Sequence, residues 1–134
     1  MVEAHPWNEG LDLGNEPMDR EHHLQIALVT AFVDAVEQRR PGIARRVGDQ
    51  LLTYSTAHFG GEELLMEVAS YPERERHAGE HAEFIAHIRQ IQRAFEEGDE
   101  QVALEAALDL RQALAMHMSG ADRRLAESSA RPRA

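Results

Sequence analysis

Apolar residues recur at three- and four-residue steps along most of the chain, which is the spacing that puts them on one face of an α-helix. Asp19 is a suitable N-cap for the first helix, which begins near Met18, while Pro72 and Gly98 mark later breaks. The pattern therefore predicts four helices, over about 18–41, 42–69, 73–97 and 100–125.

Short connections between long helices favour antiparallel neighbours. The sequence therefore predicts an all-α fold, an antiparallel up-down-up-down four-helix bundle. Residues 1–17 include Trp7 and Leu11, so we expect an extended N-terminal arm packed across the bundle. The domain is expected to cover residues 1–127, followed by a disordered tail over 128–134.

The pair Gly60-Gly61 interrupts good helix formers in the second predicted helix. Glycine in a helix interior costs about 1 kcal/mol relative to alanine. We therefore expect either close packing at this pair or some other reason to want little side chain there.

Composition narrows the classes of function. The net charge is −10 and no basic cluster offsets it, so nucleic acid and anionic membranes are poor partners. The absence of cysteine excludes disulfides, zinc–thiolate sites, iron–sulfur clusters and cysteine nucleophiles. No apolar run approaches the roughly 18 residues of a membrane span. The N-terminus is polar and acidic rather than signal-like, so we expect a cytoplasmic protein without membrane insertion.

Histidines and carboxylates are the candidate chemistry. His58 and Glu62 lie four residues apart, and His77 and His81 repeat this spacing, so each pair shares one helix face with apolar residues. In an antiparallel bundle every helix then offers an inward ligand-capable residue. The set comprises His22, His58, Glu62, His77, His81, His117 and Asp122. We expect solvated or lightly packed positions for the other histidines, His5, His23 and His87.

The size of this set favours a metal centre. A single inward histidine is more often a hydrogen-bonded core residue than a ligand. Burying five imidazoles and two carboxylates without partners would cost several kcal/mol, and a metal removes that cost. Seven donors exceed one tetrahedral zinc site, whereas two ions bridged by carboxylates use them all. The donors suit non-haem iron with an open coordination position, and suit manganese less well.

Two other metal-site patterns fit poorly. The stretch "HAGEH" at 77–81 matches the H-x-x-E-H motif of inverted zinc proteases, with Glu80 as the general base, but nothing supplies a substrate cleft. Ferritin-like oxidases need Glu-x-x-His pairs on two helices, and the sequence contains none.

Spaced motifs in a fixed order give the chain a family resemblance. It carries "DREH" at 19–22, "HFGGEELLM" at 58–66, "YP" at 71–72, "HAGEH" at 77–81 and "HMSGAD" at 117–122. With these motifs the chain resembles the hemerythrin family over nearly the whole domain. The resemblance implies two non-haem iron ions, one held by His77, His81 and His117, the other by His22 and His58. Glu62 and Asp122 would bridge them together with an oxo or hydroxo group.

The resemblance also implies a function. O2 would bind reversibly at the open position of one iron, for oxygen storage, delivery or sensing. The alternative is a di-iron redox enzyme acting on peroxide, nitric oxide or a small molecule. Whether the chain is an enzyme stays open at this point, with O2 binding favoured.

The implied O2 pocket is lined by Gln25, Phe59, Ala113, Leu114 and Met118. Invertebrate members usually have leucine, tryptophan and isoleucine in place of Gln25, Ala113 and Met118. The smaller Ala113 should open space toward the metal site. Gln25 either places an amide near the bound ligand or turns to solvent.

The step from His117 to Asp122 is five residues, which an ideal α-helix turns through about 140°. Both side chains can reach one metal pair only if the helix is locally loosened, and Gly120 between them tolerates such a distortion. We therefore predict an irregular backbone over 117–122.

Overall fold

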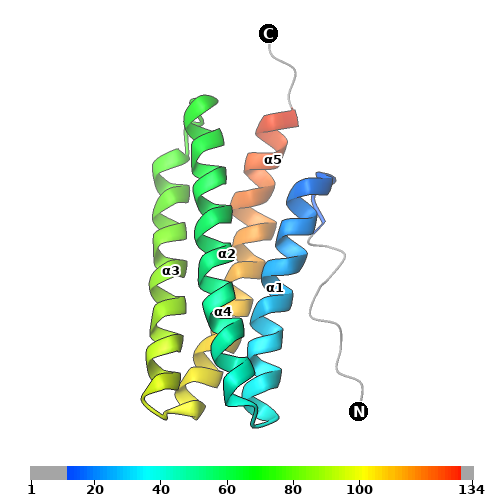
Figure 1. Ribbon diagram of the computed structural model, residues 1–134. Helices are drawn as coiled ribbons and strands as arrows, with labels where there is room; N and C mark the ends of the chain where they lie inside the picture. Colours follow the sequence, from blue (N-terminus) through cyan, green and yellow to red (C-terminus); the bar gives the residue numbers. More distant parts are fainter. Residues whose placement is uncertain (1–11, 131–134) are drawn as a thin grey trace.

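The computed structural model describes residues 12–130 as an antiparallel bundle of long helices (Figure 1). Three continuous helices are followed by a fourth column of helix, in which α4, a π-helical segment η2 and α5 follow one another without a break. The bounds are α1 Glu16–Glu37, α2 Pro41–Val68, α3 Arg74–Glu96, α4 Glu100–His117, η2 Met118–Asp122 and α5 Arg123–Ala130. Each helix packs against its chain neighbour, and α1 contacts α4, which closes the bundle. The predicted fold class is confirmed.

The first helix begins earlier than predicted. Asn15 is its N-cap, with the side chain accepting a hydrogen bond from the Met18 backbone N–H at 3.2 Å. Asp19, the predicted cap, lies inside α1, and its carboxylate accepts from the Leu13 N–H at 2.8 Å. The predicted start was therefore wrong by a few residues, because Asp19 ties down the incoming chain instead of capping the helix.

The predicted breaks between helices are confirmed. Ser70 follows α2 with a φ of +52°, and Gly98 follows α3 with a φ of +83°, both in the left-handed region that ends a helix. Asp99 then caps α4 by accepting from the Val102 N–H at 3.5 Å.

The ends of the chain were predicted less closely. The last helix continues to Ala130, so residues 128–130 of the predicted tail are helical. Residues 131–134 lie outside the described residues, as do Trp7, Leu11 and most of the predicted N-terminal arm.

The interior next to the α1–α2 and α3–α4 connections is apolar. Phe32 and Phe95 pack edge to face there, with ring centroids 5.8 Å apart. The same cluster contains Val33, Val36, Ala44, Ile88, Ile91, Ala103, Ala107 and Leu110. Burial of each large side chain contributes about 1.5–3 kcal/mol, so this half of the bundle supplies a conventional core.

Close packing does not explain the glycine pair. A Cβ added at Gly60 or Gly61 would meet no other part of the described structure within 4 Å. The first of the two expectations for this pair is therefore wrong, since both positions face outward from α2.

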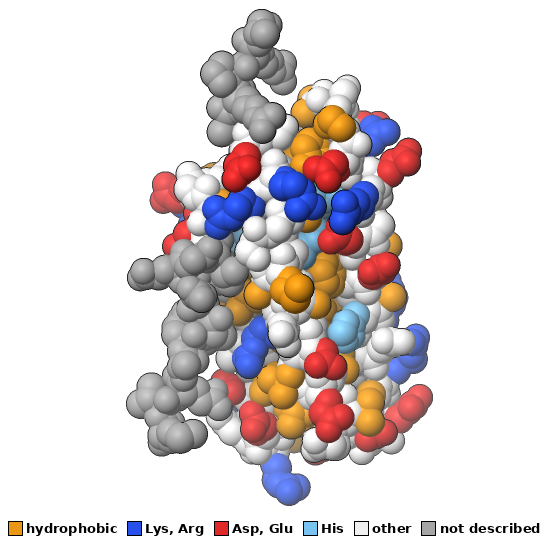
Figure 2. All heavy atoms as spheres, turned by 180° about the vertical axis from the view of Figure 1, so that it is seen from behind, with side chains coloured by type: hydrophobic (Ala, Val, Ile, Leu, Met, Phe, Trp, Pro, Cys, Tyr) orange, Lys and Arg blue, Asp and Glu red, His pale blue; other side chains and the backbone are white. Residues whose placement is uncertain are grey.

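The surface mixes charges of both signs, as the face in Figure 2 shows, with apolar side chains between them. Among the described residues, none of the helices has the length and apolar character to cross a membrane.

Candidate metal centre

The seven predicted ligand residues all lie inside one end of the bundle. α1 supplies His22, α2 supplies His58 and Glu62, α3 supplies His77 and His81, and the fourth column supplies His117 and Asp122. None of these residues is more than 7% exposed. The structure therefore brings together, from four helices, the set that helical spacing placed on inward faces.

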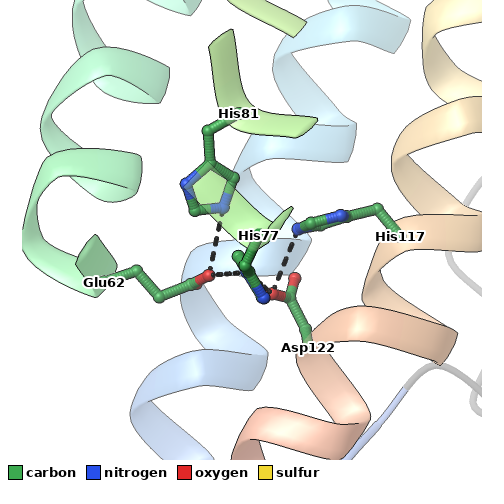
Figure 3. A group of neighbouring side chains, drawn as sticks. All are labelled: Glu62, His77, His81, His117 and Asp122. Carbon is green, nitrogen blue, oxygen red and sulfur yellow. Dashed lines mark hydrogen bonds and ion pairs between the residues drawn. The ribbon is translucent and has the colours of Figure 1, made fainter. Parts of the chain in front are cut away.

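Two groups of donor atoms form within this set. The larger group joins Glu62, His77, His81, His117 and Asp122, whose side chains point toward one another in Figure 3. The smaller group joins His22, His58 and Glu62. Within each group the donor atoms lie within 4.8 Å of one another, which is the convergence that a bound cation needs.

Glu62 faces both groups. Its Oε1 lies 2.6 Å from His77 Nε2 and 3.2 Å from His81 Nε2, whereas its Oε2 lies 3.4 Å from His58 Nε2. The carboxylate thus directs one oxygen to each group.

Asp122 does the same. Its Oδ1 lies 3.0 Å from His77 Nε2 and 3.2 Å from His117 Nε2, and its Oδ2 lies 3.0 Å from His22 Nε2. Two carboxylates that each divide their oxygens between two histidine groups have the arrangement of bridging ligands.

Many of these atoms lack a hydrogen bond despite their short separations. His22 Nε2, for example, lies 3.0 Å from Asp122 Oδ2 without forming a hydrogen bond. Within residues 12–130 the buried side-chain atoms without a partner are His22 Nδ1 and Nε2, Glu62 Oε2, His81 Nε2, His117 Nε2 and Asp122 Oδ1. An unpaired buried polar group costs about 1–3 kcal/mol, and a cation bound by the donors that face the cluster removes that cost for all of these atoms except His22 Nδ1, the second nitrogen of a ring whose Nε2 faces Asp122. The residues therefore fit a metal.

The backbone between His117 and Asp122 is irregular, as predicted. Residues Met118–Asp122 form a π-helical turn, in which the extra residue per turn changes the angle between the flanking side chains. The two side chains meet as a result, with His117 Nε2 3.2 Å from Asp122 Oδ1.

Comparison with known proteins agrees with this geometry. Residues 13–127 match the family model of the hemerythrin HHE cation binding domain. The chain belongs to the hemerythrin family. It is 28% identical over 117 residues to a bacteriohemerythrin of Ralstonia nicotianae, covering 87% of this chain and 82% of that protein. A bacteriohemerythrin of Stenotrophomonas maltophilia is 28% identical over 121 residues, with coverages of 90% and 78%. The hemerythrin match and the buried cluster together point to a metal-binding site.

Electrostatics prepares this hemerythrin site for a cation. Burial opposes ionisation of Asp122, but the interactions with His117, His22 and His77 outweigh it and hold the pKa of Asp122 far below its usual range. Burial likewise opposes protonation of His77, but Asp122 and Glu62 raise its pKa to about 9. The pKa of His117 is also raised, against burial, chiefly by Asp122. Without metal the cluster therefore holds protons that a cation would displace.

Three glutamates that sequence reasoning did not assign as site residues contact the outer nitrogens of the histidines. Glu21 Oε1 lies 3.1 Å from His58 Nδ1, Glu63 Oε2 lies 3.1 Å from His81 Nδ1, and Glu80 Oε1 lies 3.2 Å from His117 Nδ1. For Glu80 the sequence suggests only the general-base role of a protease motif. Each glutamate adjoins a cluster residue in sequence, and this adjacency is the signal that could have identified them.

Gln25 turns inward. It is 1% exposed, and its Nε2 donates a hydrogen bond to the buried Ser55 Oγ at 2.9 Å, which excludes the solvent-facing alternative. Gln25 lies one turn after His22 on α1, and Ser55 one turn before His58 on the antiparallel α2. The pair therefore lies on the apolar-core side of those two histidines.

The other predicted pocket residues divide into two places. Phe59, Leu114 and Met118 are buried in the core, and the Phe59 ring stacks on His81 with centroids 4.1 Å apart. Ala113 is half-buried and lines an open surface cleft of about 390 Å³ that reaches His117. Space does open beside Ala113, on the three-histidine side.

The histidines not assigned to the site lie apart from it where they are described. His23 is exposed and lies 3.4 Å from Asp12, and His87 is half-buried on α3. His5 lies outside the described residues.

Proposed function

We propose that this protein binds two iron ions in the buried cluster and binds O2 reversibly on the two-histidine side, for oxygen storage, delivery or sensing. The observation that carries the proposal is the division of oxygens in Glu62 and Asp122, each of which directs one oxygen to each histidine group. A single-metal site has no use for this division. The hemerythrin match and the bacteriohemerythrin relatives add support.

In this proposal the ligands divide unequally. His77, His81 and His117 would hold one ion, His22 and His58 would hold the other, and Glu62 and Asp122 would contribute to both. With one histidine fewer, the second ion would have room to take a small ligand. The bound ferrous ions supply the redox chemistry by which O2 is held.

The surrounding side chains bury the two-histidine side of the proposed site. His22 and Met118 are almost fully buried, and Phe59 packs between His58 and His81 with ring centroids 5.6 and 4.1 Å away. This burial limits entry of water and anions, which favours reversible binding over oxidation of the metal.

An optical spectrum through a redox and gas cycle tests the proposal. Protein loaded with ferrous iron under anaerobic conditions is exposed to air and then purged of oxygen, with iron content measured in parallel. We expect two irons per chain and charge-transfer bands that appear with O2 and vanish on purging. A chain that binds no iron, or only one ion, would contradict the proposal.

A second candidate function is a di-iron redox enzyme acting on peroxide, nitric oxide or a small molecule. The buried Gln25–Ser55 pair favours it, because it places an amide and a hydroxyl next to the two-histidine side, where an apolar pocket would otherwise enclose a diatomic ligand. Irreversible oxidation in air, with turnover of peroxide or nitric oxide, would favour this enzyme over the carrier.

The variant Gln25→Leu separates these alternatives further. If the amide admits water to the ligand, Gln25→Leu slows autoxidation of the O2 complex, measured as the decay of the charge-transfer bands. Ser55→Ala is the matched control, since it removes the hydrogen bond to Gln25 and leaves the amide in place. An unchanged rate in Gln25→Leu would mean that the Gln25 amide has no role in autoxidation.

A further inference from the structure

The three outer glutamates follow a regular order around the bundle. Glu21 on α1 contacts His58 on α2, Glu63 on α2 contacts His81 on α3, and Glu80 on α3 contacts His117 on α4. In each contact a glutamate reaches a histidine on the next helix of the chain. The same Glu–His contact therefore recurs at three successive helix interfaces.

Helix geometry explains the repetition. Successive residues of an α-helix point about 100° apart, so a residue next to an inward side chain faces the neighbouring helix. Glu21 precedes His22, Glu63 follows Glu62, and Glu80 precedes His81. When the helix directs the cluster residue of each pair inward, it directs the adjacent glutamate toward the next helix, beside a histidine of that helix.

Each contact fixes the protonation of a ring nitrogen. An ionised carboxylate only accepts hydrogen bonds, so the Nδ1 that faces it must carry the hydrogen. In a neutral imidazole the lone pair is then on Nε2, which is the atom that a metal requires. The Nε2 atoms of His58, His81 and His117 do face Glu62 or Asp122, at 3.2–3.4 Å.

The glutamates achieve this at little cost in desolvation. The side chains of Glu21, Glu63 and Glu80 are 48%, 40% and 35% exposed, whereas those of their histidine partners are 2–4% exposed. The carboxylates therefore keep much of their hydration while they orient buried rings. Around Glu21 the contact is braced further, because the Tyr54 hydroxyl donates to the Glu21 carbonyl at 3.2 Å and the Tyr54 ring lies parallel to His58.

We propose that Glu21, Glu63 and Glu80 are positioning residues that set the metal affinity of the site, and that they act on different ions. Glu63 and Glu80 orient histidines of the three-histidine ion, and Glu21 orients a histidine of the two-histidine ion. This inference rests on the proposed di-iron function.

Anaerobic titration of the full chain with ferrous iron against a competing chelator tests the inference. We expect Glu21→Ala, Glu63→Ala and Glu80→Ala each to weaken the affinity for one of the two ions about 10- to 100-fold. Combining Glu63→Ala with Glu80→Ala should deepen the loss of the same ion, whereas combining either with Glu21→Ala should weaken both ions. The Gln variants retain an acceptor oxygen and should recover most of the affinity.

Two controls separate positioning from general effects. Glu83 is exposed on α3 and lines the same cleft as Glu80, so Glu83→Ala removes a similar charge and should leave iron affinity unchanged. The melting temperature of the metal-free protein should fall in each Glu→Ala variant, because a buried ring nitrogen loses its hydrogen-bond acceptor, and the Gln variants should reverse this fall. The deciding readout is therefore which ion is weakened: an affinity loss shared equally by both ions, or an equal loss in Glu83→Ala, would overturn the inference.

The titration also distinguishes failure of this inference from failure of the proposed function. If the unmodified chain binds two irons and the three Glu→Ala variants bind them as tightly, only the positioning role is wrong. If the unmodified chain binds no iron, the di-iron function itself is wrong.

Discussion

The two halves of the bundle are built from the same helices but have opposite interiors. Beside the α1–α2 and α3–α4 connections the helices bury Phe32, Ile88, Phe95 and Leu110 in a closed apolar cluster. In the other half the same inward faces bury five histidines and two carboxylates. Helical periodicity continues through both halves. It therefore determines which residues are buried, but it does not determine whether the buried polar groups have hydrogen-bond partners.

The difference is energetic. The apolar half stabilises the fold by about 1.5–3 kcal/mol for each large side chain buried. The polar half contains six buried atoms without hydrogen-bond partners among the described residues, and for all but His22 Nδ1 a nearby His–carboxylate ion pair offsets part of the cost of about 1–3 kcal/mol each. The metal-free bundle therefore has a closed apolar core in one half and incompletely paired polar groups in the other. Experiments on either half can test this comparison.

Loading the site with iron should have the largest effect. At free ferrous iron about 1,000 times Kd, each bound ion stabilises the native state by about 4 kcal/mol, so two ions contribute about 8 kcal/mol. For a domain of this size that corresponds to a rise in melting temperature on the order of 30 °C. Calorimetry of metal-free and loaded protein measures the shift, and hydrogen exchange locates it. Protection should increase mainly at the amides around Glu62, His81 and His117, and a uniform increase over both halves would contradict the comparison.

Truncating the apolar half should have a smaller effect that does not depend on metal. Leu110 is fully buried, so Leu110→Ala should lower the free energy of unfolding by about 2–5 kcal/mol. Urea denaturation should give the same loss with and without iron, and iron affinity should stay unchanged. A loss that appears in only one of the two forms would mean that the halves are energetically coupled.

The polar half also shows how far sequence reasoning reaches. All seven ligand candidates, and the irregular turn between His117 and Asp122, followed from helical spacing and side-chain chemistry. The irregular turn follows from the spacing of two residues within one helix. The ligand set follows from spacing within each helix and from the chemistry of the seven side chains together. The structure confirms the π-helical turn and brings the seven residues together.

What sequence reasoning missed depends on contacts between helices. The contacts of Glu21, Glu63 and Glu80 with histidines require the rotation of one helix relative to the next, which spacing along one helix does not give. The inward turn of Gln25 likewise depends on Ser55, a partner 30 residues away on α2. The start of α1 was misplaced because two suitable caps, Asn15 and Asp19, competed locally.

Alkaline pH should weaken the metal-free polar half. The pKa of His77 is raised from 6.5 to about 9, so its protonated form stabilises the fold fully below pH 6.5, and this contribution is lost as the pH rises through 9. The melting temperature of metal-free protein should therefore fall between pH 7 and pH 10. Iron-loaded protein should lack this fall, because the metal replaces the proton. The lowered pKa of Asp122 adds a loss only in strong acid, outside this window.

His77→Gln is the control for the alkaline fall. It removes the titrating ring and keeps a polar side chain, so the decrease in melting temperature between pH 7 and pH 10 should become smaller. An undiminished fall in this variant would assign the effect to other groups.

The smallest expected effect concerns the outer face of α2, where it passes the polar half. A Cβ at Gly60 or Gly61 would meet only open space, so Gly60→Ala and Gly61→Ala should each stabilise the protein by about 0.5–1 kcal/mol through helix propensity. Gly98→Ala is the matched control. Its Cβ would also meet nothing within 4 Å, but its φ of +83° makes alanine strained, so stability should fall. Urea denaturation with and without iron measures all three variants. Because neither α2 glycine contacts the rest of the bundle, the gain should be the same in both forms, and a gain confined to one form would mean that this face of α2 responds to the metal.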